Sequence, residues 1–317
     1  MKILVTGANG FIGRYLCNEL CRQKHAVVAA VRNANTRRDC IEQVIIGSID
    51  NSTDWSMALR DVQLVIHLAA RVHVMNDSAI DPLTEYRKVN VDGTLHFALQ
   101  AAKAGVKRFI FISSIKVNGE LTAIDKPFTE EYAANPQDAY GVSKFEAEQG
   151  LLRIAQQTGM EVVIIRPPLV YGPGVKANFA RMMLAIRNRI PLPLGAIENK
   201  RSFVYVGNLV SLILRCMDHP AAANQVFLVS DGCDLSTTEL LRECAVAMEV
   251  KPILWSVPQI LIESCAALIG KRDVMQRLCG NLQVDISKGR ILLGWTPPVS
   301  VANGLKATAL DLTQGDQ

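Results

Sequence analysis

A glycine-rich turn near the N-terminus places the tightest limit on what this chain can fold into. Gly7, Gly10 and Gly13 lie in LVTGANGFIGRYL, between an apolar run and an amphipathic one. In a dinucleotide-binding turn, one glycine permits the tight bend, the next lets the backbone approach a pyrophosphate, and the last lets the helix pack on its strand. The helix N-terminus then offers N–H groups and partial positive charge to the diphosphate. A glycine turn without chemical meaning is the alternative.

Six short apolar runs in the first half of the chain predict β-strands. They are rich in Val and Ile and lack polar alternation, which is typical of strands buried on both faces of a parallel sheet. Amphipathic stretches between them predict helices over 11–23, near 84–104 and near 139–158. This order predicts an α/β fold with a Rossmann-type doubly wound parallel sheet. The predicted strands are 2–6, 26–31, 43–47, 62–69, 107–113 and 161–166.

The pattern changes after residue 166, where proline-rich loops such as RPPLVYGPG separate shorter helical stretches. We therefore expect a dinucleotide-binding domain over 1–166 and a smaller substrate-binding lobe mainly over 167–317. Strands or helices of the second part can return to the first. The helices predicted in the second part span about 178–188, 207–217, 236–248, 258–270 and 299–313.

The composition indicates a globular protein and excludes several function classes. Of the 317 residues, 49% are apolar and 20% are charged, and the net charge of +4 comes without a long basic block, so no nucleic-acid partner is expected. No uncharged apolar run reaches the roughly 18 residues of a membrane span, so no stable membrane insertion is expected. The first predicted strand begins at Lys2, which leaves no room for a signal peptide. Eight scattered cysteines without a C-x-x-C pair favour a reduced, cytoplasmic protein without a metal site.

Tyr140 and Lys144 stand four residues apart in DAYGVSKFEAE, at the start of a predicted helix. This spacing puts both side chains on one helix face, close enough for the ammonium to act on the phenol. A phenol titrates near ~10, so acid–base work at neutral pH needs a nearby cation to stabilise the phenolate. We interpret the pair as an acid–base group with its cation. A solvated helix face is the alternative, because Y-x-x-x-K alone is common.

Ser113 and Ser114 end the predicted strand 107–113 in FIFISSIKVNG. They fall at the carboxyl edge of the predicted sheet, where open α/β sheets bind ligands. A serine there can hydrogen-bond a substrate carbonyl and the oxyanion that develops from it. We expect one of the two to do this and the other only to cap the strand end.

Together these motifs resemble the extended short-chain dehydrogenase/reductase family, which includes the NAD-dependent nucleotide-sugar epimerases, dehydratases and reductases. The likeness runs in order through TGANGFIG, HLAA, VNVDGT, FISSIKVNG, YGVSK, RPPLVYGPG, RSFVYVGNL and LGWTP. It implies that Tyr140 is the acid–base residue and that Lys144 tunes its pKa and binds the ribose. It also implies that Ser114, which stands five residues before Gly119, orients the substrate carbonyl.

Two asparagines bear on this resemblance. Asn118 stands where the family often has a tyrosine, which affects the pocket wall. Asn90 matches an asparagine that supports the sheet near the site, with a structural or a catalytic role. The helices near 84–104 and 139–158 match the pair through which the family forms homodimers, so a homodimer is expected.

The resemblance further implies contacts to a nucleotide-sugar substrate and to the cofactor. Arg201 matches an arginine that contacts the nucleotide diphosphate, and Arg277 stands near the place of a second one. Asn178, beside Phe179, follows VYGPG, where the family binds the sugar nucleotide. Arg71 and His73 follow HLAA and can line the sugar pocket, although we give His73 no catalytic role. Besides Tyr140 and Lys144, the implied cofactor-binding residues are Gly7, Asn9, Gly10, Phe11, Ile12, Gly13, Arg32, Ser48, Ile49, Leu68, Ala69, Ala70 and Pro167.

Arg32 follows the strand end VVAAV, where family members that retain NAD carry Asp or Glu for the adenosine ribose. Replacing the carboxylate by a guanidinium favours a 2′-phosphate, which arginine meets with forked, charge-assisted contacts. We therefore expect NADP(H) rather than NAD(H), read by Arg32 with help from Arg37 or Arg38. An ordinary exposed loop arginine is the alternative, and NAD(H) is then the cofactor.

The stretches SSIKVNGE and RPPLVYGPGVKANF resemble most the bacterial reductases of UDP-4-keto-6-deoxy-N-acetylhexosamines in surface-polysaccharide synthesis. This implies hydride transfer from NADPH to the sugar C4 carbonyl, with Tyr140 protonating the alkoxide and Ser114 holding the oxygen. The alternative is a UDP-hexose 4-epimerase with tightly bound NAD, against which Arg32 argues. A non-catalytic dinucleotide sensor is remote because Tyr140 and Lys144 are both present. A 4,6-dehydratase is unfavoured because SSIKVN offers a lysine where acidic residues would be needed.

Overall fold

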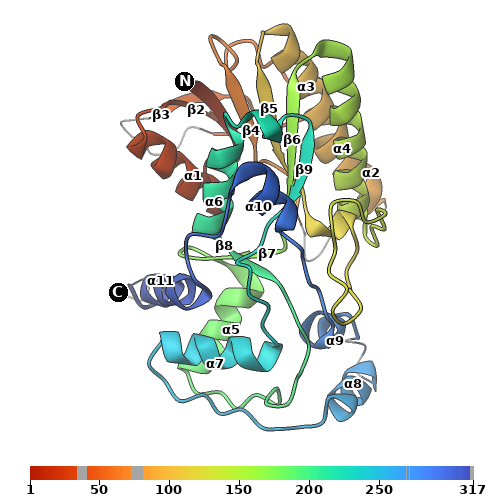
Figure 1. The fold of residues 1–317 in the computed structure, drawn as a ribbon, viewed down its shortest axis with the longest axis vertical. Helices are drawn as coiled ribbons and strands as arrows, with labels where there is room; N and C mark the ends of the chain where they lie inside the picture. The colour runs from red at the N-terminus through yellow and green to blue at the C-terminus, as the bar shows by residue number, and fades with distance from the viewer. Residues whose placement is uncertain (34–40, 73–80, 269, 271, 315–317) are drawn as a thin grey trace.

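The computed structural model describes residues 1–33, 41–72, 81–268, 270 and 272–314. Within these residues, seven parallel strands form the main sheet in the order β3-β2-β1-β4-β5-β6-β9 (Figure 1). This is the strand order of a doubly wound dinucleotide-binding sheet, so the predicted fold class is confirmed. The strands are β1 (Lys2–Thr6), β2 (Ala26–Val31), β3 (Ile41–Ile45), β4 (Leu64–His67), β5 (Arg108–Ile112), β6 (Glu161–Arg166) and β9 (Gln225–Leu228).

The sequence predicted six of these strands, and β1, β2 and β6 have the predicted bounds. β3 begins two residues earlier than predicted, and β4 and β5 are shorter at both ends. β9 was not predicted, because its four residues lie inside a part of the chain dominated by helices and loops. It pairs with β6 and extends the sheet on that side.

Helices cover both faces of the main sheet (Figure 1). Successive residues of β1 point to opposite faces: Ile3 and Val5 join the buried cluster that includes α1 and α6 side chains, whereas Leu4 joins the cluster with α3 and α4. Each large apolar side chain buried in this way contributes roughly 1.5–3 kcal/mol. The helices are α1 (Phe11–Arg22), α6 (Val206–Cys216) and α10 (Ser287–Leu293) on one face, and α3 (Thr94–Lys103) and α4 (Ala139–Thr158) on the other.

The long helix expected near 84–104 is interrupted. It consists of α2 (Pro82–Arg87), the π-helical turn η1 (Lys88–Gly93) and α3. Asp81 caps α2, its side chain accepting hydrogen bonds from the Leu83 and Thr84 N–H groups. π-helical turns occur often at functional sites, and η1 contains Asn90.

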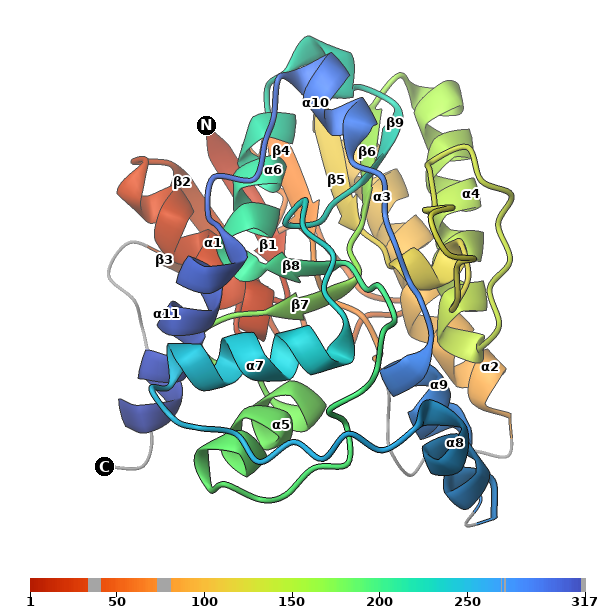
Figure 2. The ribbon, with the colours of Figure 1, turned by 60° about the horizontal axis from the view of Figure 1, so that its bottom comes forward.

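A small second sheet lies at the carboxyl edge of the main one, because β7 begins three residues after β6 ends. Its two strands, β7 (Leu169–Tyr171) and β8 (Phe203–Tyr205), are parallel. With five helices they form what we call the C-terminal lobe (Figure 2). Sequence predicted α5, α7, α8 and α11 to within two residues at each end, but not α9 or the sheet helix α10. The lobe helices are α5 (Ala177–Arg187), α7 (Thr237–Ala247), α8 (Gln259–Leu268), α9 (Arg272–Cys279) and α11 (Val301–Gln314).

Candidate active site

The glycine turn between β1 and α1 has a shape that side chains would prevent. Gly7 has a left-handed backbone with φ of 68°, and its carbonyl accepts a hydrogen bond of 2.9 Å from the Gly10 N–H. A Cβ atom on Gly13 would lie 2.1 Å from the Gly7 oxygen. α1 begins at Phe11, and no acidic side chain stands in its first turn. A close-packed turn with N–H groups at a helix start fits a dinucleotide diphosphate.

The loop after β4 packs directly on this turn. A Cβ atom on Gly7 would lie 2.9 Å from the Ala69 nitrogen. The Ala69 N–H donates a hydrogen bond of 3.1 Å to Thr6 Oγ1. Leu68, Ala69 and Ala70 are each half-buried, so the structure brings these predicted cofactor residues against the glycine turn.

A buried histidine, which the sequence interpretation missed, lies next to the Thr6 hydroxyl that holds Ala69. His67 Nδ1 lies 2.7 Å from Thr6 Oγ1, and its Nε2 lies 3.0 Å from Thr94 Oγ1. Burial, helped by the charge of Lys144, lowers the pKa of His67 to about 3. The ring is therefore neutral across the physiological pH range, and its two nitrogens link Thr6 to Thr94. The sequence feature that could have indicated this role is a single histidine at the end of an otherwise apolar strand.

The other predicted cofactor residues take several positions. Arg32 is exposed and directly follows buried Val31 at the end of β2. Ser48 Oγ donates a 2.9 Å hydrogen bond to Asp50, and Ile49 packs against Gly93. Arg37, Arg38 and His73 lie outside the described residues. Asn9 is exposed, Phe11 and Ile12 are half-buried against the C-terminal lobe, and buried Pro167 follows β6.

The predicted Tyr140–Lys144 pair lies at the start of α4, which begins at Ala139. Asp138 caps the helix, its Oδ1 accepting a 2.7 Å hydrogen bond from the Gly141 N–H. Lys144 is buried, and its Nζ donates a 2.8 Å hydrogen bond to the Ile112 carbonyl at the end of β5. The same Nζ lies 6.0 Å from the centroid of the Tyr140 ring, so the two side chains share a face as predicted.

Burial dominates the proton affinities of this pair. It lowers the pKa of Lys144 to about 7, against the opposing charge of Glu148. It also raises the pKa of Tyr140 well above its usual value, with further contributions from Asp138 and then Tyr86. With these side chains alone the phenol thus holds its proton more tightly than an exposed tyrosine, because burial and the negative charge of Asp138 both favour its neutral form.

The two serines at the end of β5 have different surroundings. Ser113 is buried, and its Oγ has no hydrogen-bond partner among the described residues. Ser114 is half-buried, and its Oγ accepts a 3.3 Å hydrogen bond from the Lys116 N–H. It thereby caps the 3₁₀ turn η2 (Ile115–Val117). Of the two, Ser114 is the more exposed.

Asn90 holds the loop after β4 against α4. Its Nδ2 donates to the Arg71 carbonyl (3.1 Å) and to Ser143 Oγ (3.0 Å), and its Oδ1 accepts from the Arg71 N–H (2.8 Å). These contacts use both ends of the amide, which favours the structural role. The Arg71 guanidinium lies 5.6 Å from the Tyr86 ring centroid, and that ring is 6.1 Å from the ring of Tyr140.

Asn118 is also occupied by structural contacts. Its Oδ1 accepts a 3.0 Å hydrogen bond from Arg166 Nη1, and its Nδ2 donates to the Thr129 carbonyl at 2.9 Å. Arg166 forms a forked ion pair with Glu148, and both side chains are buried. The sequence interpretation missed this pair. Its signal was a glutamate four residues after Lys144 on the same helix face.

In the C-terminal lobe, Arg201 is half-buried and its Nη1 donates a 2.8 Å hydrogen bond to the Gly280 carbonyl. Burial and then the positive charge of Arg277 lower the pKa of Arg201 to about 10, while Glu120 opposes this. The two predicted diphosphate arginines are therefore electrostatic neighbours, and Arg277 is exposed on α9. Two positive charges within electrostatic range of each other favour the binding of an anion near them.

Asn178 lies in the first turn of α5 rather than on a loop, and its side chain is exposed. Its neighbour Phe179 is buried and stacks on Tyr171 with ring centroids 5.4 Å apart. Phe179 therefore belongs to the core of the lobe. The sequence predicted a helix from about residue 178, and α5 begins one residue earlier, at Ala177, whose backbone is left-handed.

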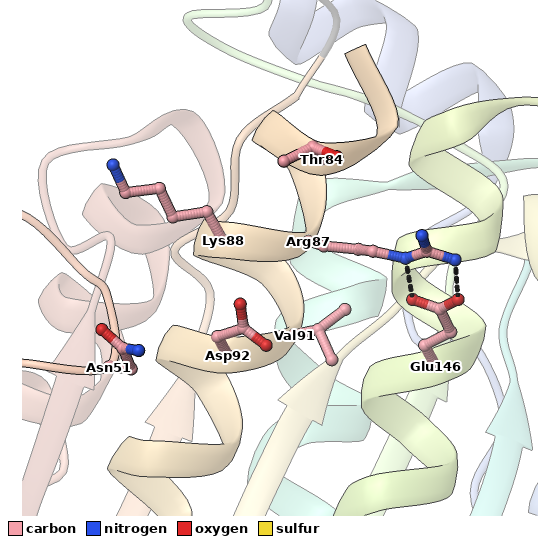
Figure 3. A pocket seen from close by; sticks show the side chains of 7 residues that line it. All are labelled: Asn51, Thr84, Arg87, Lys88, Val91, Asp92 and Glu146. Atoms are coloured by element: carbon pink, nitrogen blue, oxygen red, sulfur yellow. Dashed lines mark hydrogen bonds and ion pairs between the residues drawn. The ribbon is translucent and has the colours of Figure 1, made fainter. Parts of the chain in front are cut away.

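A hollow of about 530 Å³ lies away from these residues, on the side of α2, η1 and α4 (Figure 3). Arg87 and Glu146 form a forked ion pair across it. None of the predicted site residues lines it, so it is no part of the candidate active site. Its lining residues are Asn51, Thr84, Arg87, Lys88, Val91, Asp92 and Glu146.

Two other kinds of site were sought in the described part of the chain. No group of three or more His, Cys, Asp or Glu side chains there could hold a metal ion. Nor is any helix of those residues long and apolar enough to span a membrane.

The parallel sheet with its glycine turn defines a Rossmann-type α/β protein of the dinucleotide-binding class. The chain belongs to the NAD dependent epimerase/dehydratase family, whose model matches residues 3–230. It is thus an enzyme of the nucleotide-sugar epimerases, dehydratases and reductases. The predicted family resemblance is confirmed.

Similar proteins include both epimerases and reductases. A Vibrio cholerae protein named UDP-glucose 4-epimerase is 50% identical over 317 residues, which cover 99% of this chain and 96% of that one. GDP-6-deoxy-D-mannose reductase of Pseudomonas aeruginosa is 30% identical and covers 98% of this chain and 96% of its own. The solved structure of Thermotoga maritima UDP-glucose 4-epimerase with UDP-glucose has a TM-score of 0.78 at 24% identity, over 100% of both chains, which shows the shared fold.

Proposed function

We propose that this enzyme is a UDP-hexose 4-epimerase that works with a tightly bound dinucleotide. The observation that carries this is the 50% identity, over 99% of the chain, to the Vibrio cholerae protein named UDP-glucose 4-epimerase. It favours the epimerase, the alternative from the sequence, over the reductase that the sequence motifs favoured. The pair of half-buried Tyr140 and buried Lys144 at the carboxyl edge of the sheet supports acid–base work in either case.

The cofactor would lie along the glycine turn, with its diphosphate on the N–H groups at the start of α1. Leu68, Ala69 and Ala70 would line the same path. When bound, the dinucleotide supplies a hydride acceptor at sugar C4 and returns the hydride to either face of the carbon. The family description favours NAD for this role.

Tyr140 takes the proton from the sugar O4 as C4 is oxidised, and returns it when C4 is reduced. Ser114 donates its hydroxyl hydrogen to the same oxygen, because its Oγ already accepts from the Lys116 N–H and has its own proton to give. Lys144 is held by the Ile112 carbonyl with its Nζ 6.0 Å from the centroid of the Tyr140 ring, so in its protonated form it places positive charge beside the phenol and favours the deprotonated tyrosine.

The nucleotide diphosphate would bind in the C-terminal lobe near Arg201 and Arg277, since the charge of Arg277 acts on Arg201. The sugar would then extend toward Ser114 and Tyr140, with Arg71 and Asn178 contributing at the sides of the pocket. This assigns the lobe, as the sequence predicted, to substrate binding.

One observation favours a second candidate, a nucleotide-sugar 4-ketoreductase that consumes NADPH. Exposed Arg32 stands at the end of β2, where an acidic residue would hold the ribose hydroxyls of NAD. A guanidinium there favours the 2′-phosphate of NADP. A reductase needs a fresh reduced cofactor for every turnover, whereas an epimerase returns the hydride that it removes.

Interconversion without added cofactor separates the two candidates. The purified full chain is incubated with UDP-glucose or UDP-N-acetylglucosamine, and the products are resolved by anion-exchange chromatography. In parallel, NADPH absorbance is followed with UDP-4-keto-6-deoxy-N-acetylhexosamine. Interconversion, with NAD released on denaturation, supports the epimerase. NADPH consumption without interconversion would overturn it in favour of the reductase.

We also infer a homodimer formed through α3 and α4. Leu99 on α3 is 40% exposed, which suits a residue that a second copy covers. Light scattering of the purified chain should give twice the 34.7 kDa chain mass, and Leu99→Asp should shift the mass toward the monomer. A monomeric wild-type chain would contradict this.

A further inference from the structure

Lys116 lies between two carboxylates next to the candidate active site. It stands two residues after Ser114, in the turn η2. Its Nζ is ion-paired with Asp138 and lies 3.2 Å from Glu120 Oε1. The side chains of Lys116, Glu120 and Asp138 are 22%, 26% and 28% exposed, so all three are partly shielded from water. Ion pairs of this burial are screened less than surface pairs.

Asp138 has two effects that oppose each other. As the N-cap of α4, it accepts the Gly141 N–H and places negative charge at the positive end of the helix, which stabilises the helix. The same charge stands two residues before Tyr140 and, after burial, is the largest cause that raises the pKa of that phenol. A carboxylate cap is therefore good for the helix and unfavourable for a tyrosine that must release its proton.

The Ser114 turn and the start of α4 are in direct contact. A Cβ atom on Gly141 would lie 3.0 Å from the Lys116 carbonyl oxygen, and the Asn135 N–H donates a 3.0 Å hydrogen bond to the Val117 carbonyl. The Lys116–Asp138 ion pair spans this contact. It thus connects the segment that carries Ser114 with the helix that carries Tyr140.

We propose that Lys116 is a positioning residue: its ion pair with Asp138 fixes the Ser114 turn against α4 and offsets the carboxylate charge that opposes Tyr140 deprotonation. This inference rests on the proposed acid–base role of Tyr140. It assigns Lys116 no contact with the reacting atoms. It also explains how this chain combines an aspartate cap with a catalytic tyrosine two residues later.

The other titratable or charged groups near Tyr140 are left in place by a substitution of Lys116. Tyr86 faces it from α2, with ring centroids 6.1 Å apart, and Lys144 faces it from its own helix. Arg71 lies beyond Tyr86. A shift in the titration of Tyr140 on changing Lys116 or Asp138 therefore reports the ion pair.

The first test is the pH profile of turnover in four variants, measured as UDP-hexose interconversion. Lys116→Met leaves the Asp138 charge beside the phenol unopposed, so the rising limb should move about 0.5–1 pH unit to the alkaline side. Asp138→Asn keeps an oxygen that can cap Gly141 but removes the charge, so the limb should move to the acid side. The double variant should lie near Asp138→Asn, and Lys116→Arg should restore the wild-type midpoint.

Arg22→Met is the control, since Arg22 forms a more exposed ion pair with Glu19 on α1, outside the site. Its profile should coincide with that of the wild type. A Lys116→Met variant that is slower at every pH with an unmoved midpoint would overturn the electrostatic part of the proposal. So would a loss of rate that Lys116→Arg cannot restore.

The second test does not need catalysis. Melting temperatures of Lys116→Met, Asp138→Asn and the double variant form a double-mutant cycle. The ion pair predicts coupling: once Asp138 is changed, the loss of Lys116 should lower the melting temperature less than in the wild type. Additive losses would overturn the link between the two segments. If the chain were inactive on every UDP-hexose, the proposed function would be refuted. The melting temperatures would still test whether the ion pair couples the two segments.

Discussion

The carboxyl edge of the main sheet and the C-terminal lobe hold their candidate side chains in different ways. At the sheet edge, Lys144 is buried and bonded to the backbone of β5, beside half-buried Tyr140. In the lobe, Arg201 is only half-buried, and Arg277 is exposed on α9. The sheet edge holds its side chains in one geometry at the cost of desolvating them. The lobe keeps exposed charges that can adjust to a ligand. We therefore expect changes at the sheet edge to alter turnover, and changes in the lobe to alter substrate binding.

The largest effect should follow from Tyr140→Phe. Removing the proton-carrying phenol should lower kcat by roughly 10²–10⁴-fold, the usual contribution of a general acid–base group. Dinucleotide binding, measured by calorimetry or by cofactor released on denaturation, should persist because the glycine turn is untouched. Tyr132→Phe is the control, since Tyr132 is 52% exposed. Turnover close to the wild-type rate in Tyr140→Phe would refute the role assigned to this residue.

Arg201→Met tests the C-terminal lobe, where we expect changes to alter substrate binding. A hydrogen bond to a charged group contributes about 1.5–3 kcal/mol, so losing the diphosphate contact should raise KM roughly 10–100-fold and leave kcat much less affected. Binding of UDP alone, measured by calorimetry, should weaken in parallel. Arg153→Met, on the exposed face of α4, provides the control. A fall in kcat at unchanged KM would place Arg201 with the reaction groups instead.

The difference between the two regions also explains what the sequence could predict. At the sheet edge, the shape of the glycine turn and the shared face of Tyr140 and Lys144 could be predicted, because both are local patterns whose geometry a helix or strand enforces. Arg201 was placed by resemblance, and the structure brings it within electrostatic range of Arg277. Neither arginine could be placed from spacing alone, because they stand 76 positions apart in the sequence and loops decide where α9 lies.

What the sequence could not predict depends on contacts between distant segments. β9 joins the sheet only because its four residues pair with β6. The ion pair of Glu148 with Arg166 crosses from α4 to that strand, and that of Lys116 with Asp138 crosses from η2 to the start of α4. Helix spacing can show which face such a residue occupies, but it does not identify the partner on a distant segment. The raised pKa of Tyr140 was likewise unpredictable, because the burial of this phenol depends on contacts that its local sequence pattern does not show.

Lys144→Met should show the desolvation at the sheet edge as a change in stability. Burial lowers the folded-state pKa of Lys144 to about 7, whereas the unfolded chain titrates near ~10.4. Between these values the unfolded chain holds more protons, so this group makes wild-type stability rise with pH, and its full penalty is present below pH 7. Methionine removes the penalty but leaves the Ile112 carbonyl without its partner, at a cost of about 1–3 kcal/mol.

We therefore expect Lys144→Met to be more stable than the wild type by roughly 1–3 kcal/mol at pH 6. The gain should shrink or reverse by about pH 10, near the unfolded-state pKa. Urea unfolding at several pH values measures this. Lys103→Met, at an exposed position on α3, should show no such pH dependence. A pH-independent difference for Lys144→Met would mean that the buried amine does not titrate as described.

Arg32→Asp tests a residue at the sheet edge that, unlike Lys144, is exposed. Exchanging the guanidinium for a carboxylate should change the ratio of NADPH to NADH affinity roughly tenfold in favour of NADH, the lower range for one charged hydrogen bond. Fluorescence titration with both reduced cofactors measures the ratio. Arg60→Asp, at another exposed arginine, is the control. An unchanged ratio would make Arg32 an ordinary surface arginine and would remove the observation that favours the reductase.

The smallest effect should come from Arg277→Met. Arg277 is exposed, so its attraction to a diphosphate is screened by water and salt, and its loss should raise KM only about 2–5-fold. The effect should fade between about 20 mM and 500 mM salt, because the Debye length drops below the separation of the charges. Removing the like charge also eases the protonation of Arg201, which offsets part of the loss. A salt-independent effect as large as that of Arg201→Met would mean that α9 closes over the ligand and buries Arg277, and the contrast between a buried reaction site and an adjustable binding lobe would then fail.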